Sequence, residues 1–319
     1  MAKKKMCIAN FNTVFLKDDK EYPLLDYFDS IVMPALTCGK IIKSNGASFF
    51  FADVKVMEDA DGEYILSGIL IKDTVLEVKY NWNYQEGRLK DKKGKYQSSP
   101  YSLFLIYLKN HRMLLVRDQQ GSPSLANFRT TAKSLLETYV KKENRNLEKE
   151  NRELLPIPLV NVIGISSGGN IRNTLLNVEK ISKLLLRFYP LNGDGDIDMQ
   201  DIFNGISNVR HYVKASTGGI SLNSPQDKEK VADLIDELNG TMEPVVWVRY
   251  PESKVDSKIT MDLIVENTEI SVPDDDTKEN VSLIVSEGKR NGKINFTSAE
   301  NKKIYERNRN KIIPFLKND

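Results

Sequence analysis

The sequence predicts an α+β protein: antiparallel strands dominate its first half, and strands alternate with helices in its second half. Two observations lead to this class. Residues 47–117 contain β-branched and aromatic runs separated by turn-forming residues, which is typical of a meander of antiparallel strands. From residue 159 onward, short apolar runs alternate with segments of helical period, which favours an α+β sandwich of the split βαβ, ferredoxin-like kind.

The first half begins with an apolar strand and a short helical segment. Residues 6–15 are mostly apolar, and residues 21–36 place leucine, phenylalanine, isoleucine and valine at helical spacing. A second helix is indicated after residue 121, because Ser122 can cap it and Pro123 suits its first position. The meander between the two helices is predicted as strands at 48–59, 62–71 and 74–84 and a hairpin at 101–118 that turns near Asn110 and His111.

A polar run at residues 141–153 follows the second helix, and prolines at 156 and 158 end it. Such a run is too polar for a core, so it indicates a solvated helix end or a linker. We therefore predict a mostly antiparallel β domain with two helices at 1–150 and an α+β sandwich domain at 155–319.

The second half is predicted as alternating elements. The helix at 224–240 is the best defined, because Ser224 can cap it, Pro225 can open it and Asn239-Gly240 can close it. The other predicted helices are 170–178, 198–206 and 298–316, and the predicted strands are 158–165, 180–189, 209–215, 244–250, 258–272 and 280–287.

Composition limits the chemistry. Two cysteines, Cys7 and Cys38, cannot form a disulfide framework, and with only His111 and His211 a zinc site of the usual spacing is not expected. No window approaches the roughly 18 apolar residues of a membrane span, so we expect a protein of the reducing cytoplasm without a membrane partner. The net charge of +2 provides no global field for nucleic acid, which leaves local patches.

The carboxylate-rich loop at residues 188–201 is the first candidate site. Its oxygens fall at positions 3, 5, 7, 9 and 12 of a 12-residue pattern with Gly195 at position 6, and this part resembles the calcium loops of dockerin modules and EF-hands. Pro190 at position 1 offers no side-chain oxygen, and no second loop pairs with it, so we favour a strand-to-helix turn over a divalent site. The candidate ligands of Ca²⁺ are Asn192, Asp194, Asp196, Asp198 and Asp201.

A second candidate is the run Gly164-Ile165-Ser166-Ser167-Gly168, which has the G-x-S-x-G spacing of a hydrolase nucleophile elbow. Asp198 or Asp201, followed by His211, would complete a triad in the right order, and the same residues could instead hold a phosphate at a helix N-terminus. The neighbouring strands are predicted to be antiparallel, so we favour a flexible turn.

A third candidate is a metal-dependent nuclease site. Asp61, followed by Glu77 and Lys79, matches the D…E-x-K pattern in which carboxylates hold Mg²⁺ and the lysine steadies the attacking water. On a strand, Glu77 and Lys79 share one face while Leu76 and Val78 share the other, so a half-exposed strand explains the pattern equally well.

Two clusters of basic residues are candidate nucleic-acid contacts, because grouped Lys and Arg bind phosphates and nearby aromatic side chains can stack on bases. A solvated hairpin tip and a solvated helix face are the alternatives. The candidate contacts are Arg88, Lys90, Lys92, Lys93 and Lys95 in the first cluster and Lys302, Lys303, Arg307 and Arg309 in the second.

The order of elements in residues 155–319, including the runs at 180–194 and 234–250, loosely resembles bacterial and prophage α+β proteins associated with phage-defence loci. This resemblance implies a defence or mobile-element role on or near nucleic acid and transfers no catalytic residue. We therefore predict a protein that binds nucleic acid or a nucleoprotein partner through its basic patches. The alternatives are a non-catalytic interaction subunit or sensor, alone or as a homo-oligomer, a Mg²⁺-dependent nuclease, and a Ca²⁺-stabilised domain.

Overall fold

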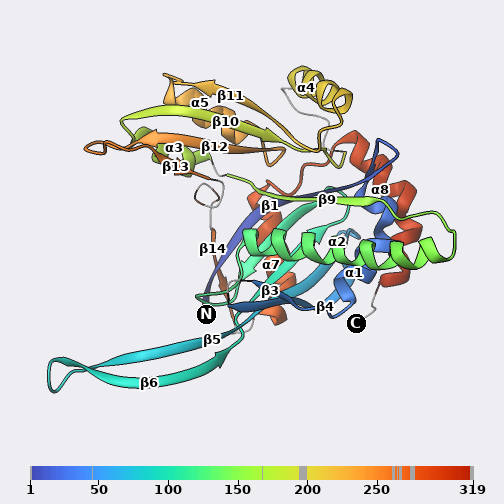
Figure 1. The fold of residues 1–319 in the computed structure, drawn as a ribbon. Coiled ribbons are helices and arrows are strands. Elements are labelled where there is room, and N and C mark those ends of the chain that lie inside the picture. The colour runs from blue at the N-terminus through green and yellow to red at the C-terminus, as the bar shows by residue number, and fades with distance from the viewer. Residues whose placement is uncertain are drawn as a thin grey trace.

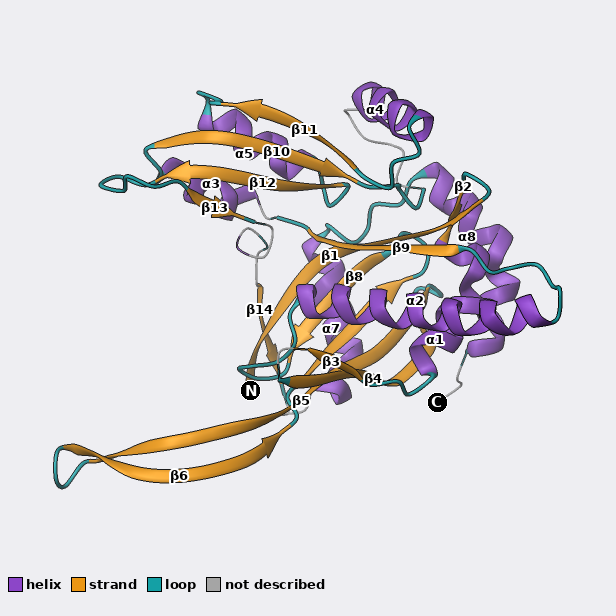
Figure 2. Ribbon diagram, in the orientation of Figure 1, coloured by secondary structure: helices purple, strands orange, loops and turns teal. Residues whose placement is uncertain are grey.

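The computed structural model describes residues 2–44, 46–166, 168–193, 200–260, 263, 265, 268–273 and 277–316. The structure contains both helices and strands, and the strands form two sheets with antiparallel pairing, which confirms the α+β class (Figures 1 and 2). Within these residues the larger sheet has ten strands and the smaller sheet has four.

The larger sheet has the order β14-β1-β8-β7-β5-β4-β3, and β2, β6 and β9 pair with its members outside this path. Most of its strands follow the predicted meander, because their apolar residues alternate with the period of two that a sheet requires. The strands are β1 (Ala2–Lys17), β2 (Lys20–Pro23), β3 (Ile42–Ser44), β4 (Ala47–Glu58), β5 (Tyr64–Asn83), β6 (Arg88–Ser98), β7 (Tyr101–Tyr107), β8 (Arg112–Arg117), β9 (Ile157–Gly164) and β14 (Thr268–Val272).

Strand β1 joins distant parts of the chain. One of its edges pairs with β14 at residues 2–6 and with β9 at residues 9–16, while β8 pairs with its other edge at residues 5–10. Two strands from beyond residue 155 therefore extend the sheet of the first half. A division of the chain near residue 150 does not coincide with the edge of this sheet.

Helices cover both faces of the larger sheet. Alternation along β8 sends Leu115 to one face, where Phe128 of α2 (Leu125–Lys149) packs, and Leu114 to the other face. There Ile284 of α7 (Val281–Asn291) packs in the same cluster as Leu114. The remaining short helices are η1 (Leu24–Tyr27), η2 (Phe28–Val32), α1 (Met33–Thr37), η3 (Thr277–Asn280) and η4 (Ile313–Phe315).

The smaller sheet has the order β11-β10-β12-β13, with every neighbouring pair antiparallel. Helices α3 and α5 supply Ile171, Leu175 and Ile235 to the core that contains Leu184 and Val246, so they cover one face of this sheet. Its elements are α3 (Gly168–Leu176), β10 (Lys180–Phe188), β11 (Gly218–Asn223), α5 (Lys228–Glu237), β12 (Met242–Arg249) and β13 (Ser257–Ile259).

Two predicted strands are wrong. Residues 209–212 end the helix α4 (Gln200–Tyr212), and residues 281–287 belong to α7. In α7 the buried residues are Ile284, Val285 and Gly288, a spacing that a helix provides. The short apolar run also fits a strand, and only packing against the sheet distinguishes the two.

Candidate nucleic-acid interface

The most unusual feature of the molecule is a two-stranded arm that leaves the larger sheet (Figure 1). β5 is one strand of 20 residues, not the two strands that the sequence predicts. Its inner half pairs with β4 and β7, whereas residues 74–83 pair with β6. We call residues 74–98 the arm, and at about 3.3 Å per residue it is roughly 30 Å long.

The arm has two chemically different faces. Strand alternation places Leu76, Val78, Tyr80 and Trp82 on one side, and the register brings Tyr96 opposite Leu76 and Leu89 opposite Trp82. The other side carries the cations. We call these the apolar face (Leu76, Val78, Tyr80, Trp82, Leu89, Tyr96) and the cationic face (Lys79, Arg88, Lys90, Lys92, Lys93, Lys95).

A bulge in β6 produces this separation. Val78 pairs with Gly94 and Tyr80 with Asp91, so Lys92 and Lys93 together oppose Lys79. The extra residue places both lysines on the side of Lys79 and shifts the alternation of every residue before them. Without it, Arg88, Lys90 and Lys92 would point to the apolar side and Leu89 to the cationic side. The hairpin therefore separates its cations from its large apolar side chains only when it pairs in this bulged register.

Part of the positive charge on the arm is not neutralised. Lys95 pairs with Glu77 at 2.9 Å, and this hydrogen bond raises the pKa of Lys95; Glu86 pairs with Arg88 at 2.7 Å and also with Lys90. Among the described residues, the three lysines at the bulge have no carboxylate within ion-pair distance. Six basic and three acidic residues give the arm a net charge of +3, whereas the whole chain has +2. The three lysines are Lys79, Lys92 and Lys93.

The second predicted basic cluster is largely used within the fold. On α8 (Ala299–Ile312), Arg307 donates to both carboxylate oxygens of Asp26 at 2.8 and 3.0 Å. Arg309 lies over the ring of Tyr64 and donates to its hydroxyl at 3.1 Å. α8 lies on the opposite side of the molecule from the arm, so the clusters do not form one surface (Figure 1). Lys302 and Lys303, the other two cations of this cluster, are exposed, as Arg307 and Arg309 are.

The predicted nuclease residues lie far apart. Asp61 precedes β5, whereas Glu77 and Lys79 belong to the arm, roughly 40 Å along the strand from its inner end. Ligands of one Mg²⁺ must all approach within about 2.1 Å of the ion, which these residues cannot do in a single chain. The sequence spacing misleads because one long strand separates the residues where a hairpin would have brought them together.

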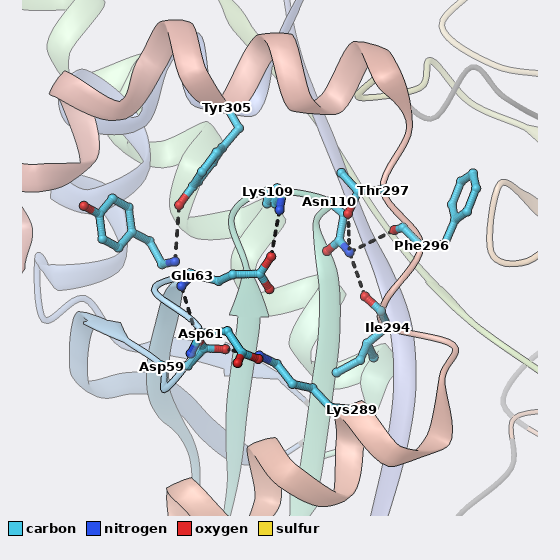
Figure 3. Close-up of polar contacts among 11 residues, drawn as sticks. Asp59, Asp61, Glu63, Lys109, Asn110, Lys289, Ile294, Phe296, Thr297 and Tyr305 are labelled. Carbon is cyan, nitrogen blue, oxygen red and sulfur yellow. Dashed lines mark hydrogen bonds and ion pairs between the residues drawn. The ribbon is translucent and has the colours of Figure 1, made fainter.

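Asp61 instead takes part in the contacts that fasten α7 and α8 to the large sheet (Figure 3). The carboxylate of Asp59 accepts from the backbone N–H groups of residues 61 and 63, both at 2.9 Å, and pairs with Lys289 of α7 at 2.6 Å. Lys289 also pairs with Asp61. Burial alone would lower the pKa of Lys289, but hydrogen bonds to Asp59 and Asp61 raise it. Tyr305 of α8 accepts from the N–H of Tyr64 at 3.3 Å.

The predicted catalytic triad is not assembled. Ser166 is buried and its hydroxyl donates to Asp236 of α5 at 3.3 Å. His211 lies on α4, where its ring nitrogen is 3.7 Å from Glu21 and 3.2 Å from Arg210. Asp198 lies outside the described residues. Ser166 therefore has an aspartate partner other than the predicted ones and no recorded contact with His211.

Asn192 links the second half to the first. Its side-chain oxygen accepts from the N–H of Leu24 at 2.9 Å, and its own N–H donates to Asn12 at 2.9 Å. This oxygen therefore already accepts a hydrogen bond within the fold. Asp194, Asp196 and Asp198 lie outside the described residues, and the side chain of Asp201 is also not described. In the part of the chain that is described, no group of three or more His, Cys, Asp or Glu could hold a metal ion.

No protein-family model matches this chain, and a comparison with curated proteins finds no significant relative. None of the helices among the described residues has both the length and the apolar character needed to cross a bilayer.

Proposed function

We propose that the chain binds nucleic acid through the cationic face of the arm and that the preferred ligand is a duplex. The observation that supports this is the bulge, which keeps six cations on one face and leaves three lysines there without carboxylate partners in the described structure. Neighbouring like charges destabilise a ribbon, so a polyanion that neutralises them would stabilise the arm.

The separation of the two faces favours a duplex over a single strand. Proteins that bind single strands combine cations with aromatic platforms on one surface, so that phosphates and bases are contacted together. Here Tyr80, Trp82 and Tyr96 point away from the lysines. A duplex presents phosphates without exposed base faces, and its major groove, about 12 Å wide, admits a two-stranded ribbon.

The test is a fluorescence-anisotropy titration against short duplex and single-stranded DNA and RNA, with Mg²⁺ and with EDTA, between about 50 and 200 mM salt. Each phosphate contact contributes about 0.9 to the slope of log affinity against log salt. We therefore expect the variant Lys79→Gln/Lys92→Gln/Lys93→Gln to lose two to three units of slope, roughly, if each lysine contacts one phosphate. Lys302→Gln/Lys303→Gln on α8 is the control and should bind as the unmodified chain does.

A second pair of variants tests the role of the bulge. Lys93→Gln removes one charge and keeps the bulge, whereas insertion of one threonine after Lys79 keeps every charge and gives the extra residue a partner, which removes the bulge. We expect the insertion to weaken binding much more than the substitution, because regular pairing would turn Arg88, Lys90 and Lys92 to the side of Leu76 and Val78. Equal effects, or no duplex binding at any salt concentration, would contradict the proposal.

A protein-interaction module is the second candidate function, and the apolar face of the arm favours it. Large exposed apolar surfaces usually mark interaction sites. An apolar interface responds little to salt, which distinguishes it from phosphate binding in the same titration.

Three predictions from the sequence remain proposals. The smaller sheet is proposed to be a split βαβ unit, supported by β11 and β12, which both run antiparallel to the intervening β10 and are connected through α5. A defence or mobile-element role rests on the resemblance of residues 155–319. Two domains are supported by the two separate sheets, with β9 and β14 of the second half belonging to the larger sheet.

A further inference from the structure

We propose that two copies of the chain dimerise by packing the apolar faces of their arms against each other. This inference goes beyond nucleic-acid binding and does not depend on it. The occupant of the apolar face is then a second copy of the same ribbon, related to the first by a two-fold axis.

The apolar face is exposed along most of the arm. Its members Leu76, Tyr80, Trp82, Leu89 and Tyr96 are between 47% and 61% exposed in the single chain. None of them belongs to either of the two cores, so the body of the protein does not cover them. A two-stranded ribbon with a bare apolar face is marginally stable in water, and burial of that face would stabilise it.

The available area is sufficient for a weak dimer. A large side chain that is half exposed contributes about 100 Å², so five such side chains from each copy give about 1,000 Å² in total. A specific interface needs at least about 1,000 Å². We therefore expect association in the micromolar range.

Charge distribution favours a second copy over other occupants. The apolar face carries one charged residue of its own, Asp91, opposite Tyr80. Packing two such faces about 10 Å apart, as in a β-sandwich, buries the aromatic side chains. The lysines of both copies then point outward on opposite sides. A single-stranded nucleic acid on this face would lack nearby cations for its phosphates.

Sedimentation equilibrium without nucleic acid, from about 1 to 100 µM protein, tests the proposal. The full chain should show a monomer–dimer equilibrium in this range. Tyr80→Thr/Trp82→Thr removes two aromatic rings and keeps strand propensity, so it should weaken dimerisation at least tenfold. The variant with three glutamines at positions 79, 92 and 93 is the matched control, and it should dimerise at least as well as the full chain.

A spectroscopic readout identifies the surface involved. The chain has two tryptophans, Trp82 and Trp247. In the variant Trp247→Phe, the emission of Trp82 should shift to the blue as the protein concentration rises. A full chain that remains monomeric at 100 µM, a dimer unaffected by the threonine variant, or a Trp82 emission independent of concentration would each overturn the proposal. Because nucleic acid is absent, failure here is separate from failure of duplex binding.

Discussion

Two consecutive lysines in β1 show how strand alternation determines whether an ion pair is exposed or buried. Lys3 points to solvent and pairs with Glu269 at 3.1 Å, with side chains 75% and 57% exposed. Lys4 points inward and pairs with Asp118 at 3.0 Å, with side chains 5% and 16% exposed. Thr277 also donates to Asp118, at 2.7 Å. The inner pair therefore joins three segments, β1, the end of β8 and η3.

Removal of the inner carboxylate should destabilise the fold. Asp118→Asn removes the carboxylate charge to which both Lys4 and Thr277 donate, so we expect a loss of about 2 kcal/mol in the free energy of unfolding. Glu269→Gln removes the partner of the neighbouring exposed lysine and should cost less than about 1 kcal/mol. Urea denaturation of the two variants measures the difference, and equal losses would contradict this account.

The carboxylate of Asp118 should also make the free energy of unfolding depend on pH in the acidic range. Burial alone would raise the pKa of Asp118, but hydrogen bonds from Thr277 and Lys4, and the charge of Lys4, lower it below 3.8. Because the folded value lies below the unfolded one, the contribution is present above about pH 3.8 and is lost as pH falls through the folded value. Asp118→Asn should therefore reduce the acid dependence of unfolding below pH 4.

Residue identity alone predicts few of these roles. The grouping of Lys92, Lys93 and Lys95 is visible in the sequence, and the cationic face includes all three. Asn192 was predicted to lie in a turn, and the partners of its described hydrogen bonds, Leu24 and Asn12, lie far away in the chain. The partners of Asp61, Arg307 and Arg309 lie far away in the chain, so local spacing could not reveal that these side chains serve the fold.

At the scale of elements, the arm should be separable from the body. Thr74 and Ser98 are paired across the ribbon, so an Asn-Gly turn placed between them in place of residues 75–97 would close a short hairpin. We expect the shortened chain to keep its melting temperature, because the side chains of the arm lie outside both cores. It should lose both duplex binding and dimerisation.

Thermal melting, the anisotropy titration and sedimentation together check this prediction. If the shortened chain retains duplex binding, the nucleic-acid surface lies elsewhere. If it fails to fold, the arm contributes to the body in a way that the contacts do not indicate. The control is Ser221→Ala on the exposed strand β11, which should leave the melting temperature, duplex binding and dimerisation unchanged.

Element types were predicted well where the pattern is long and less well where it is short. The strands of the meander, the helix at 228–237 and the terminal helix follow from periodicity and turn residues. The helix α2 is capped by Ser124 with Asn127 rather than by the predicted Ser122. The arm was missed because residues 74–84 were predicted as a separate meander strand and residues 88–95 as a basic segment between strands, whereas β6 spans Arg88–Ser98 and β5 is continuous. The residues of a strand do not specify how many other strands pair with it.

At the scale of the whole molecule, the first 153 residues should not fold alone. β14 and β9 cover one edge of β1, and α7 covers one face of the larger sheet. A fragment of residues 1–153 would expose both that edge and that face. We expect it to aggregate or to unfold without a cooperative transition, whereas co-expression with residues 154–319 should restore a cooperative melt. A cooperative melt of the fragment alone would support the predicted division.

The polar run at 141–153 shows why the predicted boundary was placed there. Residues 141–149 are the exposed end of α2, and their polarity reports contact with solvent. A linker between domains would have the same composition. The pairing of β9 with β1 joins positions about 150 residues apart, and no local pattern specifies it.

The continuity of β5 also determines how the molecule would respond to force. A load on the arm tip that separates its strands would break the hydrogen bonds between β5 and β6 one pair at a time. The inner half of the same strand is held by β4 on one side and β7 on the other, and a pull along it loads many bonds in shear at once. The arm would therefore yield first under tension, while the body to which it is joined remains folded.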